Sequence, residues 1–196
     1  MSHIFKHFHL VNQHRFKVFI NCTKCGFIWR GLVHDLSKYS RKEFVTSAKY
    51  YQGNSSPIYE ERKHHDMYSS VAIHHTRHNK HHFEYWIDTW KGDIVLPKIP
   101  YKYSVEYVCD VIAASETYNK KSYKKDMPLN YFLEREGYYL MHPMNKEFIE
   151  FCLKEYANNG FKGIKKKITK QKYKEINANY PKEAIIIPFY SKEGKF

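Results

Sequence analysis

Residues suited to binding a metal ion are concentrated in two short parts of this chain. Seven of the thirteen histidines fall between residues 64 and 82, and a His-Asp doublet, His34-Asp35, stands upstream within "GLVHDLSKYS". Imidazole is the commonest protein ligand for transition metals, and carboxylates supply the hard oxygen ligands of hydrolytic or redox sites. A single histidine is more often a core or surface residue than a ligand, but the set as a whole indicates a metal site.

The same residues occur in an order that can serve one site. His14 comes first, the doublet follows, then histidines near 75 and 81–82, and finally Asp110, each on a separate predicted helix. Side chains on facing helices of a bundle converge on its core, where metal sites are built. The order therefore predicts one metal centre inside a helical bundle.

This order resembles the HD superfamily of metal-dependent phosphohydrolases, whose hallmark is a His, a His-Asp doublet and a distant Asp on a helical bundle. "HDLSK" is similar to the HDIGK-like form of the HD-GYP branch, "NKHHFEYW" is similar to the HHE segment of that branch, and "VCDVIAASETY" resembles its helix with the last Asp. The resemblance covers about residues 10–120. The chain also looks like a little-characterised bacterial and phage family of HD-like proteins.

The resemblance implies an HD-type helical bundle that holds one or two divalent transition-metal ions, from among Mn, Fe, Zn, Ni and Co. Four residues match the core ligands of the superfamily, namely His14, His34, Asp35 and Asp110. Three more match the extra ligands of its two-metal members, namely His75, His81 and His82.

Other polar residues near these positions are candidates for catalysis and substrate binding. On a helix, Lys38 would share a face with Asp35, the expected catalytic ligand, and its ammonium would neutralise charge on a phosphate. Arg77 and Lys80 are further candidates for a phosphate contact, and Glu84 is a candidate carboxylate for orienting a ligand histidine. Each of these side chains also has a plain interpretation as a solvated surface ion or a salt-bridge partner.

These residues predict an enzyme, a metal-dependent phosphohydrolase that acts as a phosphatase or phosphodiesterase on a nucleotide or another phosphate ester. In such enzymes a divalent ion lowers the pKa of water toward neutrality and polarises a phosphoryl oxygen. Two alternatives remain open. One is a di-iron HD-type oxygenase with the same ligands, and the other is a nucleic-acid or nucleotide binding module that uses the basic run "KGIKKKITKQKYK" and a structural metal site.

The elements that must position these residues are mostly helical. Apolar residues recur at three- and four-residue intervals over residues 12–35, with Gly26 at the joint between two helices, and Ser40 begins a capping-box pattern with Glu43. The segments 60–75 and 101–118 are typical of further helices, the second of them in the core. We expect 79–92 to be helical and 92–100, which contains two prolines, to be a connection. The predicted fold class is mainly α.

The chain is expected to form one domain with an extension, because 196 residues suit a single core. Residues 1–126 would form the HD-like metal-binding domain, and 127–160 would continue it with two helices but no catalytic residues. Residues 161–196 would form a basic extension with a helix and one short strand or extended arm.

Composition limits the partners and the compartment. An excess of 33 Lys and Arg over 20 Asp and Glu gives a formal charge of +13, which favours anionic partners, here a phosphate-containing small molecule, with nucleic acid a further possibility. No window approaches the roughly 20 apolar residues that cross a bilayer, so we expect a cytoplasmic protein without a membrane partner.

Cysteine usage agrees with that compartment. Cys22, Cys25, Cys109 and Cys152 are too few and too scattered for a disulfide framework, so reduced thiols are expected. The "CTKC" pair is interpreted as two structural cysteines, because no second CxxC follows it.

Overall fold

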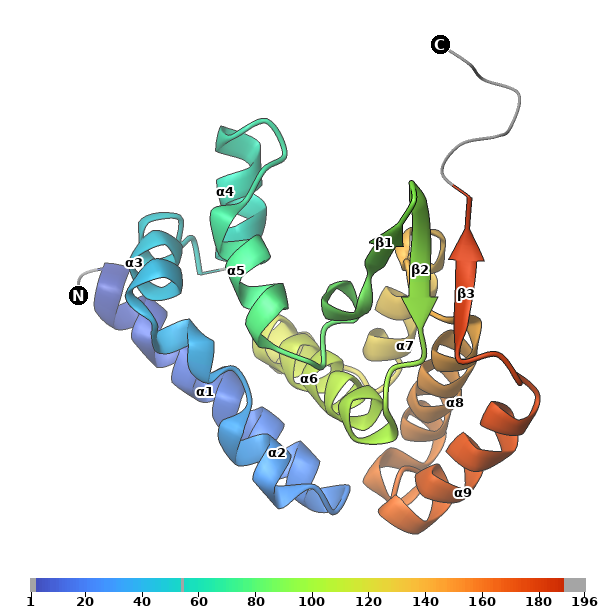
Figure 1. The fold of residues 1–196 in the computed structure, drawn as a ribbon. Helices are drawn as coiled ribbons and strands as arrows, with labels where there is room; N and C mark the ends of the chain where they lie inside the picture. Colours follow the sequence, from blue (N-terminus) through green and yellow to red (C-terminus); the bar gives the residue numbers. More distant parts are fainter. Residues whose placement is uncertain (1–2, 54, 189–196) are drawn as a thin grey trace.

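The computed structural model describes residues 3–53 and 55–188, and this part of the chain is mainly α, as the sequence predicts (Figure 1). The end of the predicted extension, residues 189–196, lies outside the described residues. The helices of the described ranges are α1 (His3–Lys24), α2 (Ile28–Val33), α3 (Arg41–Lys49), α4 (Pro57–His64), α5 (Ser70–His78), α6 (Tyr101–Asn119), α7 (Met127–Leu133), α8 (Pro143–Asn159) and α9 (Lys166–Ala178). Short 3-10 turns connect them, namely η1 (Leu36–Tyr39), η2 (Phe83–Trp86), η3 (Lys120–Ser122), η4 (Glu136–Tyr138) and η5 (Gly160–Lys162).

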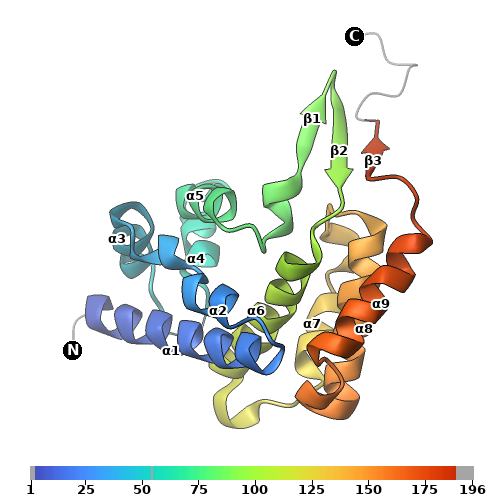
Figure 2. The same cartoon turned by 60° about the horizontal axis from the view of Figure 1, so that its bottom comes forward.

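Helix α6 runs between two sets of helices, with α1 to α5 on one side and α7 to α9 on the other (Figures 1 and 2). Its apolar side chains at Val108 and Ile112 pack in one core with Val18 of α1 and with Phe148 and Leu153 of α8. Burying these side chains is the main force that fixes α6 against both sets. The prediction of a core helix at 101–118 is confirmed, and it places the polar residues of α6 beside the helices of the N-terminal half.

Helices α1 and α2 form a tight hairpin. The chain reverses at Gly26, whose φ of +78° favours glycine, so the predicted joint between two helices is confirmed. A Cβ added at Gly31 would lie 2.8 Å from the Cα of Phe19, so α2 approaches α1 more closely than a side chain at that position would permit. This close packing holds the end of α2 next to the middle of α1.

A three-stranded antiparallel sheet corrects the prediction for residues 79–100. The strands β1 (Asp88–Trp90) and β2 (Asp93–Pro97) form a hairpin, so the expected helix over 79–92 is wrong apart from the turn η2, and much of the expected connection is a strand. The Lys91-Gly92 loop has positive φ at both residues, which suits a tight two-residue hairpin turn. Pro97 is tolerated because it lies at the end of β2.

The short strand predicted in the extension is present. Strand β3 (Ala184–Ile187) pairs with β2, with Ile94 opposite Ile187, and completes the sheet in the order β1-β2-β3. Helix α9 buries Ile176 in the main core. The described part of the extension is therefore packed on the body of the protein.

The four cysteines are free and buried, as predicted. The sulfurs of Cys25 and Cys109 lie 3.7 Å apart inside the core, without a disulfide between them. Within residues 3–53 and 55–188, no helix combines the length and the apolar character needed to cross a bilayer.

Candidate metal centre

The His-Asp doublet lies at a sharp break in the chain. Helix α2 ends at Val33, Asp35 adopts a left-handed backbone with φ of +51°, and the 3-10 turn η1 begins at Leu36. Aspartate tolerates this conformation better than most residues, and the break falls at the end of the helical pattern predicted for residues 12–35. As a result both side chains of the doublet point inward, and His34 is 0% and Asp35 is 1% exposed.

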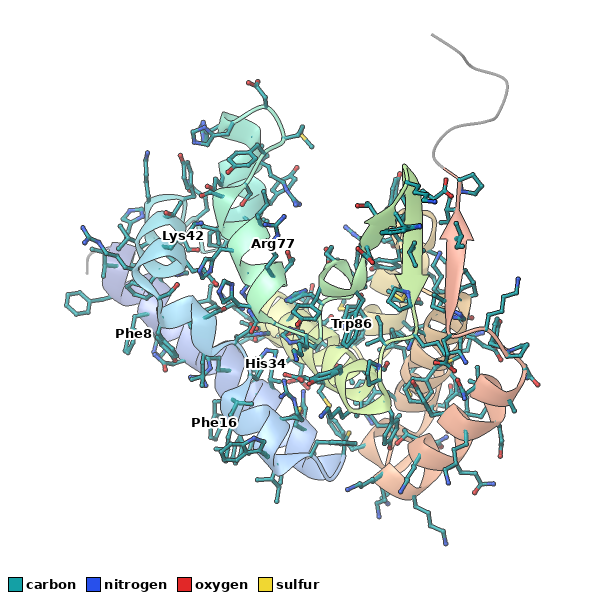
Figure 3. All side chains as sticks on the ribbon, in the orientation of Figure 1. Phe8, Phe16, His34, Lys42, Arg77 and Trp86 are labelled. Carbon is teal, nitrogen blue, oxygen red and sulfur yellow. The ribbon has the colours of Figure 1, made fainter. Side chains whose placement is uncertain are left out.

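One group of ligand atoms comes from α1, the doublet and α6. The Nε2 atom of His14 lies 2.9 Å from Oδ1 of Asp110, and the Nε2 atom of His34 lies 3.3 Å from Oδ2 of Asp35 and 3.5 Å from Oδ1 of Asp110. One nitrogen or oxygen from each of these four residues lies within 4.8 Å of the other three. In Figure 3 His34 lies where the end of α2 approaches α6. We name these four residues the α1–α6 group.

A second group of ligand atoms shares Asp35 with the first. The Nε2 atoms of His75 and His81 each lie 3.5 Å from Oδ1 of Asp35, and Nε2 of His82 lies 2.9 Å from Nε2 of His75. His75 comes from α5, whereas His81 and His82 follow α5 in a non-helical segment, which differs from the helix expected there. We name these four residues, Asp35 included, the α5 group. The carboxylate of Asp35 presents Oδ2 to one group and Oδ1 to the other, so this side chain lies between them.

Two buried glutamates hold the outer nitrogens of these histidines. Oε1 of Glu106 lies 3.1 Å from Nδ1 of His34 and 3.4 Å from Nδ1 of His81. Oε2 of Glu43 lies 2.9 Å from Nδ1 of His75. A carboxylate accepts a hydrogen bond only from a protonated nitrogen, so in the neutral imidazole each Nε2 keeps its lone pair for the centre.

Three buried polar atoms at the centre have no hydrogen-bond partner among the described residues. They are Nε2 of His34, Nε2 of His81 and Oδ1 of Asp35. Burying a polar atom without a partner costs on the order of 1–3 kcal/mol, so native proteins seldom collect several in one place. All three are potential ligand atoms, and they belong to the same clusters. The residues therefore fit a metal ion, and these buried His, Asp and Glu clusters can hold one.

The electrostatics keep the two aspartates ionised. Burial would raise the pKa of Asp35, but His34, Lys38 and His75 outweigh it and hold the pKa well below its usual range. The pKa of Asp110 is likewise well below its usual range, because its close contacts with His14 and His34 outweigh its burial. Both carboxylates are therefore available as anionic ligands at neutral pH.

The histidines differ in how strongly they hold a proton. Burial lowers the pKa of His14, and Lys38 lowers it further. Burial also lowers the pKa of His34, but the charge of Asp35 and the neighbouring carboxylates of Asp110 and Glu106 outweigh it and raise this pKa well above its usual value. A metal ion at Nε2 of His34 must therefore displace a proton.

Lys38 lies at the edge of the centre. Its ammonium is 2.6 Å from Oδ2 of Asp35, and its side chain keeps 29% of its surface exposed. Burial lowers the pKa of Lys38, but the charges of Asp35 and Asp110 outweigh burial and raise it, so the side chain is a cation. The contact arises through the 3-10 turn, in which the Lys38 amide donates to the Asp35 carbonyl, and not through the α-helical face expected from the sequence.

The other expected contact residues lie apart from the ligand atoms. Arg77 and Lys80 are exposed, and in the view of Figure 3 Arg77 lies apart from His34. Lys80 lies over the ring of Tyr85 at 5.6 Å. Glu84 makes no side-chain hydrogen bond to a histidine in the described part of the chain, and the orienting contacts expected of it belong to Glu43 and Glu106.

The sequence carried weak signals for these two glutamates. Glu106 precedes Asp110 by four residues, a spacing that places both on one face of a helix such as α6. Glu43 was assigned to a capping box. Ser40 does cap α3, accepting from the Glu43 amide, but the Glu43 carboxylate contacts His74 and His75 instead of completing the box.

A large cavity opens beside the centre. Its volume is about 1010 Å³, and Asp110 and His82 form part of its wall, so one residue of each group borders it. The opposite wall comes from α7 and the turn η4, which belong to the segment that was expected to lack catalytic residues. Glu84 also lines the cavity, and removal of water from its surroundings raises the pKa of its carboxyl group. Six aromatic side chains contribute to the wall, namely Phe83, Tyr107, Tyr118, Tyr131, Tyr138 and Tyr139.

Comparison with known families gives one match. A model described as "Family of unknown function (DUF5662)" matches residues 3–155. The chain belongs to this family. The segment that matches DUF5662 contains both ligand groups, both orienting glutamates and the wall of the cavity, whereas α9 and β3 lie beyond it. No curated protein and no solved structure matches this DUF5662 chain.

Proposed function

We propose that this DUF5662 protein is a metal-dependent phosphohydrolase with two divalent transition-metal ions, one on each side of Asp35. The observation that carries the proposal is the shared carboxylate. Asp35 is buried, belongs to two groups of four potential ligands, and faces histidines with both of its oxygens. The order of these ligands along the chain is also the order that resembles the HD superfamily.

The chain supplies two mixed sets of nitrogen and oxygen ligands. His14, His34 and Asp110 would hold one ion with Asp35, and His75, His81 and His82 would hold the other with Asp35. Such sets suit Mn, Fe, Co, Ni and Zn better than Mg or Ca, which prefer oxygen ligands alone. Ions bound there would lower the pKa of water and polarise a phosphoryl oxygen.

Residues at the border of the cavity and Lys38 would act on the substrate. Asp110 and His82 border the cavity, so the phosphate of a substrate in the cavity would lie next to both ligand groups. Lys38 adds a cation beside the ligand Asp35, from where it would offset negative charge on the phosphate as that charge grows in the transition state. The aromatic wall gives the organic part of the substrate a surface for stacking, which suits a nucleotide.

The test is an activity panel on protein reconstituted separately with Mn, Fe, Co, Ni and Zn. Nucleotides and simple aryl phosphate mono- and diesters are supplied, and release of phosphate or of the alcohol is measured. We expect at least one metal form to hydrolyse phosphate esters, with activity lost on chelation and restored on adding the metal back. Absence of hydrolysis with every metal would contradict the proposal, and oxygen consumption by the iron form alone would replace it with an oxygenase.

A further inference from the structure

The cavity wall is poor in positive charge, although the chain as a whole carries +13. Of the described residues that line it, Arg135 is the one Lys or Arg. Its guanidinium lies 3.5 Å from the carboxylate of Glu134 and 3.9 Å from the centre of the Tyr131 ring, so its charge is already engaged. Glu134 offsets this cation, and Glu84 adds a further carboxyl group, so the wall has no net positive charge to offer a phosphate.

Bound divalent ions would instead supply positive charge at the end of the cavity that holds the ligand groups. Lys38, which is paired with Asp35, lies beside these groups without lining the cavity. A terminal phosphate ester carries about two negative charges at neutral pH and would be matched at this end. Each further phosphate of a di- or triphosphate would extend into the wall that holds Glu84 and Glu134.

Polyphosphate sites in proteins are lined by lysine, arginine or successive backbone N–H groups, which offset each added charge. This wall offers mainly rings, together with the neutral polar side chains of Ser115, Asn119 and Asn130. Such a lining suits a planar, uncharged group with a few hydrogen-bonding atoms. A volume of about 1010 Å³ is at the upper end of small-molecule sites and leaves room for a nucleoside.

We infer that the substrate is a monophosphate ester of a planar group, of the nucleoside monophosphate kind, and that the cavity discriminates against di- and triphosphates. This inference rests on the proposed hydrolase function. In the reaction, water adds to phosphorus, the ester P–O bond breaks, the leaving oxygen takes a proton to become the free alcohol, and inorganic phosphate carries away the oxygen of the water. No oxidant or second substrate is required.

The test compares AMP, ADP and ATP on the metal-loaded protein, followed by the other nucleoside monophosphates. We expect kcat/KM to fall by about tenfold for each added phosphate, the scale of one unbalanced charge at a few ångströms in a water-filled cavity. The affinities of non-hydrolysable phosphonate analogues of AMP and ATP, measured by titration calorimetry, should fall in the same order. Equal or better use of ATP would overturn the inference and leave the hydrolase proposal standing.

A charge reversal sharpens this test. Glu134→Lys places a cation on the wall and should improve ATP relative to AMP by about tenfold, both in kcat/KM and in analogue affinity. Glu136→Lys is the matched control, because Glu136 is exposed on the neighbouring turn but does not line the cavity, and it should leave the ratio unchanged. An unchanged ratio in Glu134→Lys would contradict the inference. If no ester is hydrolysed, the proposed function fails, and the analogue affinities still decide what the cavity accepts.

Discussion

The two ligand groups that meet at Asp35 are built in different ways. The α1–α6 group stands on helices that the hydrophobic core fixes in place, with Asp110 on the central helix α6. The α5 group depends on one short helix and on the non-helical segment after it, held by polar contacts from Glu43, Asn79 and Ser37 to His75. Packing therefore positions one half of the centre, and hydrogen bonds position the other half.

This difference has a consequence for stability. Core side chains constrain α1 and α6 whether or not a ligand is present, because burying them is favourable in itself. Residues 79–82, which include His81 and His82, have no apolar side chain, so polar contacts such as those of Asn79 hold this segment in place. We therefore expect the α1–α6 group to keep its arrangement when the metal is removed, and the α5 group to depend more on the metal.

Replacing the shared carboxylate should have the largest effect, because it removes a ligand from both groups. Asp35→Asn is expected to lower turnover by at least about 1000-fold while the protein remains folded. Asp126→Asn is the matched control, since Asp126 is exposed and distant in sequence from both groups, and it should retain full activity. Full turnover in Asp35→Asn on every active substrate would contradict this role and show that His34 and Asp35 form a buried polar pair without a catalytic function.

The orienting glutamates separate the two groups. Glu106→Gln disturbs a histidine of each group, His34 and His81, and should weaken the binding of both ions by about 10–100-fold. Glu43→Gln disturbs His75 and should weaken one ion only. Metal titrations of the two variants check this. Equal losses in both variants would contradict the division into two groups.

Lys38 tests chemistry without touching a ligand. Lys38→Ala should leave the metal content near that of the wild type, while kcat/KM falls by one to two orders of magnitude, or about 1.4–2.7 kcal/mol of transition-state stabilisation. Lys42→Ala is a suitable control, because Lys42 is an exposed lysine on α3. A loss of metal in Lys38→Ala would assign this residue to the structure of the centre instead of to the substrate.

The pH dependence should be a smaller effect with a definite sign. The pKa of His34 is raised, because Asp35, Asp110 and Glu106 outweigh the effect of its burial. In the metal-free protein its protonated form stabilises the fold below the unfolded pKa, and this contribution is lost as pH rises through the folded pKa. A metal ion competes with that proton, so the rise in melting temperature on adding metal should be greater at pH 8 than at pH 6. An equal rise at both values would contradict proton competition at His34.

The basic helix α9 should contribute least to the reaction. Its exposed lysines lie beyond the residues that match the family. Changing Lys167, Lys170 and Lys174 to Gln should keep kcat/KM within about twofold, in line with surface substitutions in general. The same change would lower any salt-dependent binding of nucleic acid. A loss of turnover comparable to that of Lys38→Ala would place α9 in the function of the site.

The sequence predicted the mainly α fold, because apolar residues recur with the period of a helix. It also predicted the residues that converge on the metal centre, because these His and Asp residues follow a recognisable order along the chain. All seven residues expected as ligands belong to the two groups. The hairpin β1–β2 was missed because two prolines suggested a connection. Pro97 is the last residue of β2, where a proline does not interrupt the strand. Glu43 was missed because its contact with His75 spans 32 residues, and no local pattern reports a contact of that kind.

The direct test of the shared carboxylate is the number of metal ions bound per chain. Metal-free protein is saturated with Mn or Zn, and the bound metal is counted by elemental analysis in the wild type and in His14→Ala, His75→Ala and Asp35→Asn. We expect two ions per chain in the wild type, one in each histidine variant because each removes a ligand from one group, and fewer than one in Asp35→Asn. A wild type that binds no ion, or an Asp35→Asn variant that binds as many as the wild type, would contradict a centre organised around Asp35.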